Sequence, residues 1–404
     1  MENAKSFESV GRGNVLVIGN SGVGKSTLIN AVLGEDVAVT GWGTSGTTDK
    51  LDIYESESIP FRIIDSVGFE PSFVKERKAI NAVKKWSRNS AKEGCEDNKI
   101  NVIWFCVEGT TSKLFPKAIK DLSRATAMWE SIPVIVVITK SYSAPERSRN
   151  IEMVNNAFAN QKRYAKNLRK VIPVVAATYR LNDTAFAAPE GITELIDATN
   201  EVMPEGLKAG EKDLFAFKLK RKRALAQSIV GASTTAAVAV GAAPIPFADA
   251  AILAPIEILE INSLAQLYGI KKDEDSKRFL SSIVEVGTAS IAAKTAISAL
   301  KAIPGINIAA SVLNAVIAGS IVAAIGEGSI YAFEKVYTGE KSIADIDWLK
   351  NVIESSLSSQ FVDKVAQVVK EVSENGVAKD TSKLIADLLA AAFGASGKSG
   401  AANQ

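Results

Sequence analysis

Residues 15–33 read V-L-V-I-G-N-S-G-V-G-K-S-T-L-I-N-A-V-L, and this stretch decides the fold of the first half of the chain. The apolar, β-branched run at 15–18 predicts a buried strand. Apolar residues after Thr27 recur at helical spacing and end at Gly34, which predicts a helix that stops at this glycine. A strand, a G-x-x-x-x-G-K-S loop and a helix in this order are typical of a phosphate-binding loop.

The residue types of this loop suit the binding of a nucleoside triphosphate. Glycines let backbone N–H groups turn toward phosphate oxygens, and the start of the helix adds partial positive charge. We expect Lys25 to reach the β- and γ-phosphates and the Ser26 hydroxyl to ligate Mg²⁺. The predicted nucleotide-binding residues here are Asn20, Ser21, Gly22, Val23, Gly24, Lys25, Ser26 and Thr27.

A second motif, D-S-V-G at 65–68, follows the apolar run at 61–64. A carboxylate at the end of a strand suits a site for Mg²⁺, and Gly68 is placed to meet the γ-phosphate. The intervening segment 40–49, T-G-W-G-T-S-G-T-T-D, predicts a mobile loop whose threonine completes the metal shell only when the γ-phosphate is bound. Thr48 is the first choice for that threonine and Thr47 the second. The candidate catalytic residues are therefore Thr48 and Gly68, and the candidate metal ligands are Ser26, Thr48 and Asp65.

Composition excludes several other chemistries. The 404 residues include no histidine. This excludes every catalytic triad, metal site or general base that needs a histidine. Cys95 and Cys106 are the two cysteines, which indicates a reducing cytoplasm without a zinc site or a disulfide framework. The 47 basic and 45 acidic residues nearly balance, so net charge gives no reason to expect DNA as a partner. The first 12 residues lack an apolar core, and we expect no signal peptide.

Alternating apolar segments predict an α/β fold for residues 1–200, with a mostly parallel sheet and helices on both faces. The remaining chain is expected to be all-α and rich in Ala and Gly. Its divisions are a basic linker helix at 201–223, a hydrophobic helical domain at 224–340, amphipathic C-terminal helices at 341–393 and a disordered tail at 394–404. Strands are expected at 15–18, 51–55, 61–65, 100–107, 134–139 and 171–176, and helices near 73–86, 117–129 and 151–168.

Taken together, the loop G-N-S-G-V-G-K-S-T, the segment S-G-T-T-D and the motif D-S-V-G-F resemble the small-GTPase superfamily, in its Era/septin-like and 50S-ribosome-binding-type branch. The run I-N-V-I-W-F-C-V at 100–107 is similar to a strand in a subset of these G domains. The resemblance implies a P-loop G domain that binds GTP or GDP with Mg²⁺ and hydrolyses GTP.

The same resemblance places the base-recognition motif at 139–142, where the chain reads T-K-S-Y. It implies that Lys140 packs its stem on the base, that Thr139 holds the loop, and that Ala176 and Ala177 offer their backbone to the base. Tyr142 stands where the family has its guanine-reading aspartate, which leaves selectivity for GTP over ATP open.

The resemblance also implies slow hydrolysis. Phe69 follows Gly68, at the position where a glutamine orients the attacking water in Ras-like proteins, and a phenyl ring cannot do this. Some relatives use a potassium ion held by an asparagine at the fourth position of the loop. That position is Gly22 here, with Asn20 at the second, so the device is not supported. We expect faster turnover only when a dimer or a partner supplies a charge.

Two uncharged runs of 25 residues, 224–248 and 302–326, stand out in the second half. Each is long enough to cross a membrane, but their Ala, Gly, Ser and Thr gain little from lipid, so a spanning helix and a soluble bundle both stay open. The basic stretch at 215–224 suits either an acidic lipid surface or a solvated linker helix.

Motifs at 243–250 and 266–270 resemble the YcjF-like helical family of unknown function, which is often joined to such a G domain and commonly assigned to membranes. Three functional hypotheses follow. The first is a GTP-dependent switch, cytoplasmic or membrane-associated, whose helical domain meets lipids or forms a homodimer. The second is a membrane-anchored nucleotide-binding scaffold with little turnover, and the third is an ATP-driven enzyme. A ribosome or RNA partner is implied by the family name alone, because no basic surface interleaved with aromatic residues supports it.

Overall fold

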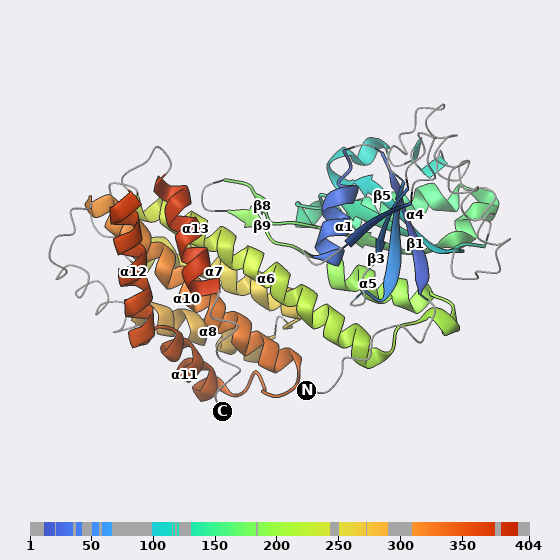
Figure 1. Ribbon diagram of the computed structural model, residues 1–404. Helices are drawn as coiled ribbons and strands as arrows, with labels where there is room; N and C mark the ends of the chain where they lie inside the picture. Colours follow the sequence, from blue (N-terminus) through green and yellow to red (C-terminus); the bar gives the residue numbers. More distant parts are fainter. Residues whose placement is uncertain are drawn as a thin grey trace. The chain divides into compact units, whose positions relative to one another are not determined.

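A computed structural model gives the fold, and the chain forms two compact units. The first unit comprises residues 1–177 and 189–221, and the second comprises 178–188 and 222–404 (Figure 1). The described residues are 12–20, 22–34, 38–42, 51–55, 59–66, 99–114, 116–117, 119–120, 131–182, 185–242, 250–271, 273–289, 309–375 and 381–394.

A seven-stranded sheet forms the centre of the first unit, with strand order β2-β3-β4-β1-β5-β6-β7. Strands β4, β1, β5, β6 and β7 pair in parallel, whereas β2 and β3 are antiparallel to their neighbours. This confirms the mostly parallel α/β fold expected from the sequence. The strands are β1 (Gly13–Gly19), β2 (Ala38–Trp42), β3 (Leu51–Glu55), β4 (Phe61–Ser66), β5 (Ile100–Glu108), β6 (Val134–Thr139) and β7 (Leu168–Pro173).

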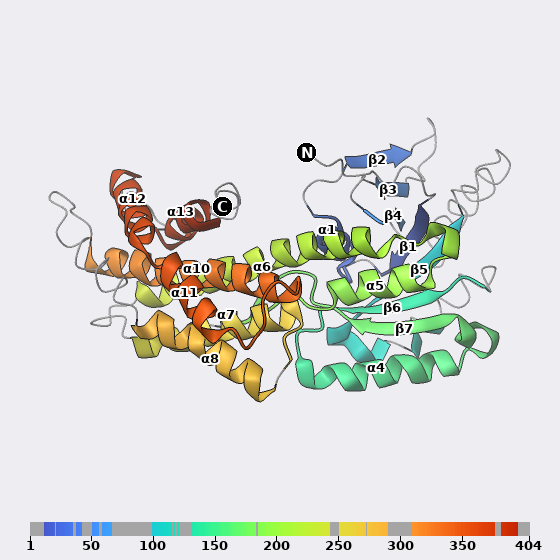
Figure 2. The same ribbon diagram turned by 90° about the horizontal axis from the view of Figure 1, so that it is seen from below.

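Helices cover both faces of this sheet (Figure 2). Phe105 of β5 packs in one apolar cluster with Val154 and Phe158 of α4 (Ala144–Ala159). Successive residues of a strand point to opposite faces, so Trp104 faces the other way, where its Nε1 donates to Thr199 of α5 (Ile192–Val202) at 2.9 Å. The helix predicted after the glycine-rich loop is α1 (Lys25–Leu33), which ends at Gly34 as expected.

Three elements differ from the sequence-based expectation. Residues 40–42, assigned to a mobile loop, lie in β2, because pairing with β3 overrides the weak strand preference of Gly41. The helix expected at 151–168 is α4 at 144–159, which has Pro145 in its first turn and is followed by a 3₁₀ segment, Lys162–Asn167. Strand β7 therefore starts at Leu168 and ends at Pro173, which places it earlier than 171–176. The helix expected at 73–86 and most of that at 117–129 lie outside the described residues.

The second unit is a helical bundle, which confirms the expected all-α region. A two-stranded hairpin, β8 (Tyr179–Arg180) and β9 (Phe186–Ala187), also belongs to it. Helix α10 lies in its middle, in contact with α7, α8, α11, α12 and α13 (Figure 1). The helices are α6 (Glu211–Gly241), shared with the first unit, α7 (Ala250–Tyr268), α8 (Glu274–Ala289), α10 (Ala310–Tyr337), α11 (Ile346–Ser356), α12 (Ser359–Asn375) and α13 (Thr381–Gly394).

Small residues bring the bundle helices close together. A Cβ added at Gly319 would lie 2.6 Å from side-chain carbons of Val238 and Leu389, and one at Gly326 would lie 2.7 Å from Val230. Among the described helices, α6 and α10 are long and apolar enough to cross a membrane, and 56% and 61% of their most apolar windows are buried inside the structure. Core helices of bundles share these properties, so the finding is weak evidence for a membrane.

Two carboxyl groups of α7 are buried in the bundle. Glu257 is 3% and Glu260 is 0% exposed. Burial raises the pKa of Glu257 to about 7. Burial also holds the pKa of Glu260 well above its ordinary value, and the nearby Glu257 and Glu327 add to that shift. Removing a carboxylate from water disfavours its charged form, so both groups keep their protons at pH values where an exposed glutamate has lost its own.

Because the folded chain keeps these two protons, its stability depends on pH. Between an unfolded pKa of about 4.3 and the raised folded values, the folded chain binds more protons than the unfolded chain, so the free energy of unfolding falls as pH rises. The slope approaches about 1.4 kcal/mol per pH unit for each retained proton. We expect Glu260→Gln to flatten the slope between pH 5 and 8, measured by urea unfolding followed by far-ultraviolet circular dichroism. Glu354→Gln, at an exposed position of α11, is the control, and equal slopes in all three proteins would contradict the assignment.

Candidate functional site

The loop between β1 and α1 has the conformation of an anion-binding turn. Gly22 and Gly24 adopt left-handed torsions, with φ of 79° and 96°, where a side chain would be strained. Lys25 begins α1 and folds back over the loop, and its Nζ donates to the carbonyls of Gly19 at 2.9 Å and Asn20 at 3.1 Å. The ammonium group is therefore held above the turn, close to the helix N-terminus that favours negative charge.

Two of the predicted metal ligands lie in described parts of the chain. Ser26 is exposed in the first turn of α1. Asp65 lies at the carboxyl end of β4, in register with Val17 of β1, and is only 6% exposed. Its Oδ1 has no hydrogen-bond partner among the described residues. Burial raises the pKa of Asp65, and the charge of Lys25 opposes that shift. A buried carboxylate oxygen without a donor is a fitting ligand for a hard cation such as Mg²⁺.

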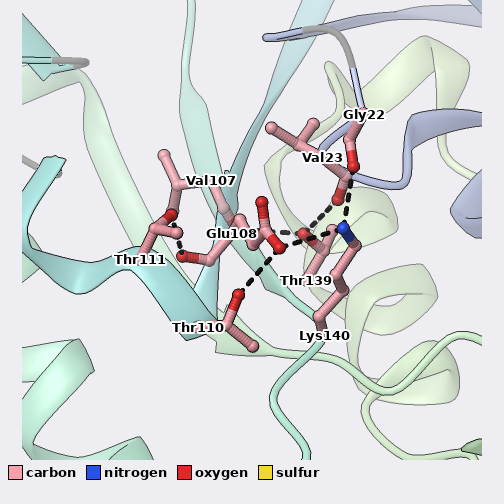
Figure 3. A network of polar contacts seen from close by, with 8 residues as sticks. All are labelled: Gly22, Val23, Val107, Glu108, Thr110, Thr111, Thr139 and Lys140. Atoms are coloured by element: carbon pink, nitrogen blue, oxygen red, sulfur yellow. Dashed lines mark hydrogen bonds and ion pairs between the residues drawn. The ribbon is translucent and has the colours of Figure 1, made fainter.

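Thr139 connects the loop after β1 to the carboxyl ends of β5 and β6 (Figure 3). Its side chain is 2% exposed, and its hydroxyl lies 2.5 Å from the carbonyl oxygen of Val23 and 3.0 Å from that of Val107. These two acceptors belong to the phosphate-binding turn and to β5. One buried hydroxyl at the end of β6 therefore lies within hydrogen-bond distance of both the turn after β1 and the end of β5.

Lys140 makes a second connection to the same turn. Its Nζ donates to the carbonyl of Gly22 at 2.8 Å and to Oε1 of Glu108 at 2.9 Å (Figure 3). Its backbone has a φ of 52°, the one positive value for a non-glycine residue in the described part of the chain. The phosphate-binding turn and the predicted base-recognition residues are therefore joined directly.

Sequence reasoning did not identify Glu108, the last residue of β5. Oε1 of Glu108 also accepts from the Thr110 hydroxyl at 2.7 Å. The hydrogen bond from Thr110 and the neighbouring Lys140 lower the pKa of Glu108 against the opposing effect of burial, so the carboxyl group is charged at neutral pH. A signal was available, because Glu108 ends a strand beside Thr139 and the carboxyl ends of parallel strands are the usual place for ligand contacts.

Sequence reasoning also missed an ion pair that supports the predicted base-recognition loop at 139–142. Arg147 of α4 donates through Nε to the carbonyl of Ser141 at 2.9 Å, and its guanidinium pairs with Glu190. Glu190 in turn exchanges two backbone hydrogen bonds with Val175, of 2.9 and 3.0 Å. The loop containing Tyr142 is thus fixed to the segment that leads into Ala176 and Ala177. Ala177 is exposed and Ala176 half-buried.

Ser21, Thr48 and Gly68 lie outside the described residues, as does Phe69. The other predicted site residues lie at the carboxyl ends of β1, β4 and β6 or in the segments that follow β1, β6 and β7. These four strands and β5 are neighbours in the parallel part of the sheet, in the order β4-β1-β5-β6-β7, so the residues at their carboxyl ends gather at one edge. These residues are Asn20, Gly22, Val23, Gly24, Lys25, Ser26, Thr27, Asp65, Thr139, Lys140, Ala176 and Ala177.

Comparison with known protein families identifies two regions of the chain. Residues 14–140 match the model of the 50S ribosome-binding GTPase family, and residues 214–360 match that of a domain of unknown function, DUF697. The first unit contains a P-loop GTPase domain of this family. The expected resemblances, a GTPase domain joined to a helical domain of unknown function, are confirmed.

Individual relatives of the G domain cover only part of the chain. GTPase Era of Clostridium botulinum (strain Eklund 17B / Type B) is 24% identical over 210 residues, which cover 50% of this chain and 59% of Era. GTPase Der of Neisseria meningitidis serogroup B (strain ATCC BAA-335 / MC58) is 40% identical over 89 residues, or 22% of this chain and 17% of Der. The chain thus spans less than two thirds of these relatives. The structure of Aquifex aeolicus Era bound to GDP·AlF4⁻ has 20% identity and a TM-score of 0.32, covering 53% of this chain and 67% of Era.

The Thr139 contacts lead to a stability prediction. Thr139→Val keeps the shape of the side chain but leaves the carbonyl of Val23 without the hydroxyl donor that lies 2.5 Å from it, so we expect a loss of about 1–3 kcal/mol in the free energy of unfolding. Thr139→Ser keeps the hydroxyl and should lose less. Urea unfolding measures both, and amide hydrogen exchange in the loop at 20–24 should quicken in the valine variant alone. Equal stability of the two variants would rule out the proposed connection.

Proposed function

We propose that the chain binds GTP with Mg²⁺, hydrolyses it slowly, and uses the bound nucleotide to switch the helical unit between two states. The observation that supports nucleotide binding most directly is the fold of Lys25 over a turn whose glycines have left-handed torsions. A turn of this kind points backbone N–H groups at one place, and the ammonium group supplies the charge that a triphosphate needs.

Ser26 and Asp65, with Thr48, are the residues proposed to hold Mg²⁺. The bound ion supplies positive charge that offsets the charge developing on the phosphates during hydrolysis. Lys25 orients the β- and γ-phosphates, and Gly68 offers its backbone N–H to the γ-phosphate. Thr139 and Lys140 fix the turn and the base side of the pocket, where Ala176 and Ala177 contribute backbone groups.

Slow turnover follows from the absence of a water-orienting side chain at Phe69. The chain has no histidine that could act as a general base in its place. We therefore propose that positioning and charge account for hydrolysis, and that a partner or a second copy of the chain accelerates it. The family description names the 50S ribosome, but a net charge of +2 gives no electrostatic support for an RNA partner.

Lys25→Ala tests nucleotide binding. Removal of the ammonium group takes away a charge-assisted contact to the phosphates, so the Kd for GTP in Mg²⁺ should rise by about 100-fold or more. Isothermal titration of the full chain measures this, with Lys166→Ala, at an exposed position, as the matched control. Wild-type affinity in the Lys25 variant would overturn the proposal. Competition of GTP by ATP in the same assay decides the selectivity that Tyr142 leaves open.

Chain connectivity supports the proposed coupling to the helical unit. The chain enters that unit directly after Ala177, forms the β8–β9 hairpin and returns to the G domain at Pro189. Within the helical unit the hairpin packs near α6, where the hydroxyls of Thr178 and Ser228 lie 3.1 Å apart. Helix α6 then runs from the G domain into the helical unit without a break. A shift of the loop at 176–177 therefore acts on an element of the other unit.

Hydrogen exchange tests this coupling. Peptides covering 178–188 and 222–241 should exchange at different rates in the GDP state and in the state with a non-hydrolysable GTP analogue, because the hairpin follows the base loop directly. Mass spectrometry of the full chain measures the difference, and the Lys25→Ala variant, which should not respond to nucleotide, serves as the control. A change limited to the G domain would contradict the switch.

The alternative function is a membrane-anchored nucleotide-binding scaffold, which the apolar helices α6 and α10 favour. Flotation with liposomes of acidic lipids, in both nucleotide states, separates the two functions. The scaffold predicts binding in both states, whereas the switch predicts binding in one state or self-association into a homodimer.

A further inference from the structure

The side chain of Lys140 is held at both sides by acceptors from two other elements. The carbonyl of Gly22 lies in the phosphate-binding turn, and the carboxylate of Glu108 ends β5 (Figure 3). A free lysine side chain loses much rotamer freedom when it is fixed, so ordering its stem before a ligand arrives removes part of the free-energy penalty of binding. The left-handed backbone of Lys140 is itself unfavourable, and these contacts help to offset it.

The carboxylate that fixes Lys140 is in turn fixed by its surroundings. Thr110 donates to the same oxygen that Lys140 reaches. Gly109 permits the close approach of this corner, because an added Cβ would lie 3.1 Å from the carbonyl oxygen of Thr139. The buried Asn150 of α4 donates to the carbonyl of Gly109 at 3.1 Å and pins the corner from the other side. Glu108 is thus a rigid, charged support for Lys140.

We propose that Glu108 is a positioning residue for the nucleotide base, acting through Lys140 by holding the lysine stem ready before the nucleotide binds. This inference rests on the proposed function, in which that stem packs on the base. Since Lys25 and the glycine turn provide the phosphate contacts, Glu108 should affect the affinity that comes from the base and leave the affinity for phosphate alone unchanged.

The test compares GDP with inorganic pyrophosphate, which carries the same number of phosphates and no base. Isothermal titration of the full chain in Mg²⁺ gives both Kd values. For Glu108→Ala we expect the Kd of GDP to rise about tenfold, the size of effect that loss of one charge-assisted contact produces, and that of pyrophosphate to stay the same. Glu108→Gln keeps a hydrogen-bond acceptor and should lie between the wild type and Glu108→Ala. Glu152→Ala, at an exposed position of α4, is the matched control.

A double-mutant cycle with Lys140→Ala decides whether the effect passes through the lysine. If it does, Glu108→Ala adds no further loss of GDP affinity in the Lys140→Ala background. Multiplying effects would show that Glu108 acts independently of Lys140 and would overturn the proposal. Equal weakening of GDP and pyrophosphate would also overturn it, because the phosphate turn itself would then have been disturbed.

Failure of the proposed function gives a different result. In that case the wild type binds GDP no better than the Lys25→Ala variant does. If the wild type binds GDP and Lys25→Ala does not, while Glu108→Ala matches the wild type, only the positioning role is wrong.

Discussion

The candidate site of the G domain depends on the hydrogen bond between the hydroxyl of Thr139 and the carbonyl of Val23. This hydroxyl belongs to the end of β6, yet it reaches the carbonyl of Val23 in the turn after β1, across the intervening strand β5. Parallel strands bring the loops at their carboxyl ends to one edge, but loops have no ladder of hydrogen bonds to hold them in register. The hydroxyl of Thr139 and the side chain of Lys140 hold the turn after β1 in place relative to the end of β6. The shape of the phosphate-binding turn is therefore set by β6 as well as by its own glycines.

How far the site was predictable from sequence depends on how local its chemistry is. The turn from Gly19 to Ser26 was predictable because phosphate binding needs consecutive residues between a strand and a helix, and all three elements are present. Glu108 and the Arg147–Glu190 pair were missed because their contacts join residues 32 and 43 positions apart. The position of Glu108 at the end of a strand was a signal in the sequence, but its contact with Lys140 depends on the order of the strands, which becomes known only from the fold.

The fold shows the same division between local and tertiary information. Strand β6 is a continuous apolar run and was predicted at the residues where it occurs, because burial on both faces leaves a clear pattern. Strand β2 contains Gly41 and is held by its pairing with β3, which composition does not reveal. In the helical unit the abundance of Ala and Gly predicted helices that pack closely, but not the burial of Glu257 and Glu260 within them. A glutamate on an otherwise apolar helix is expected to face solvent until the positions of the neighbouring helices are known.

The β8–β9 hairpin is an excursion of the chain from the G domain into the helical unit. In the chain order it separates Val175 from Glu190, yet these two residues form a backbone bridge and Glu190 is held by Arg147. The bridge closes the base of the excursion, and Ala176 and Ala177 lie just inside it. Arg147 also donates to the carbonyl of Ser141, and it therefore joins the predicted base-recognition loop to the root of the hairpin. Under the proposed function, a nucleotide that reorders the loop at 139–142 would act first on the root of a segment that belongs to the helical unit.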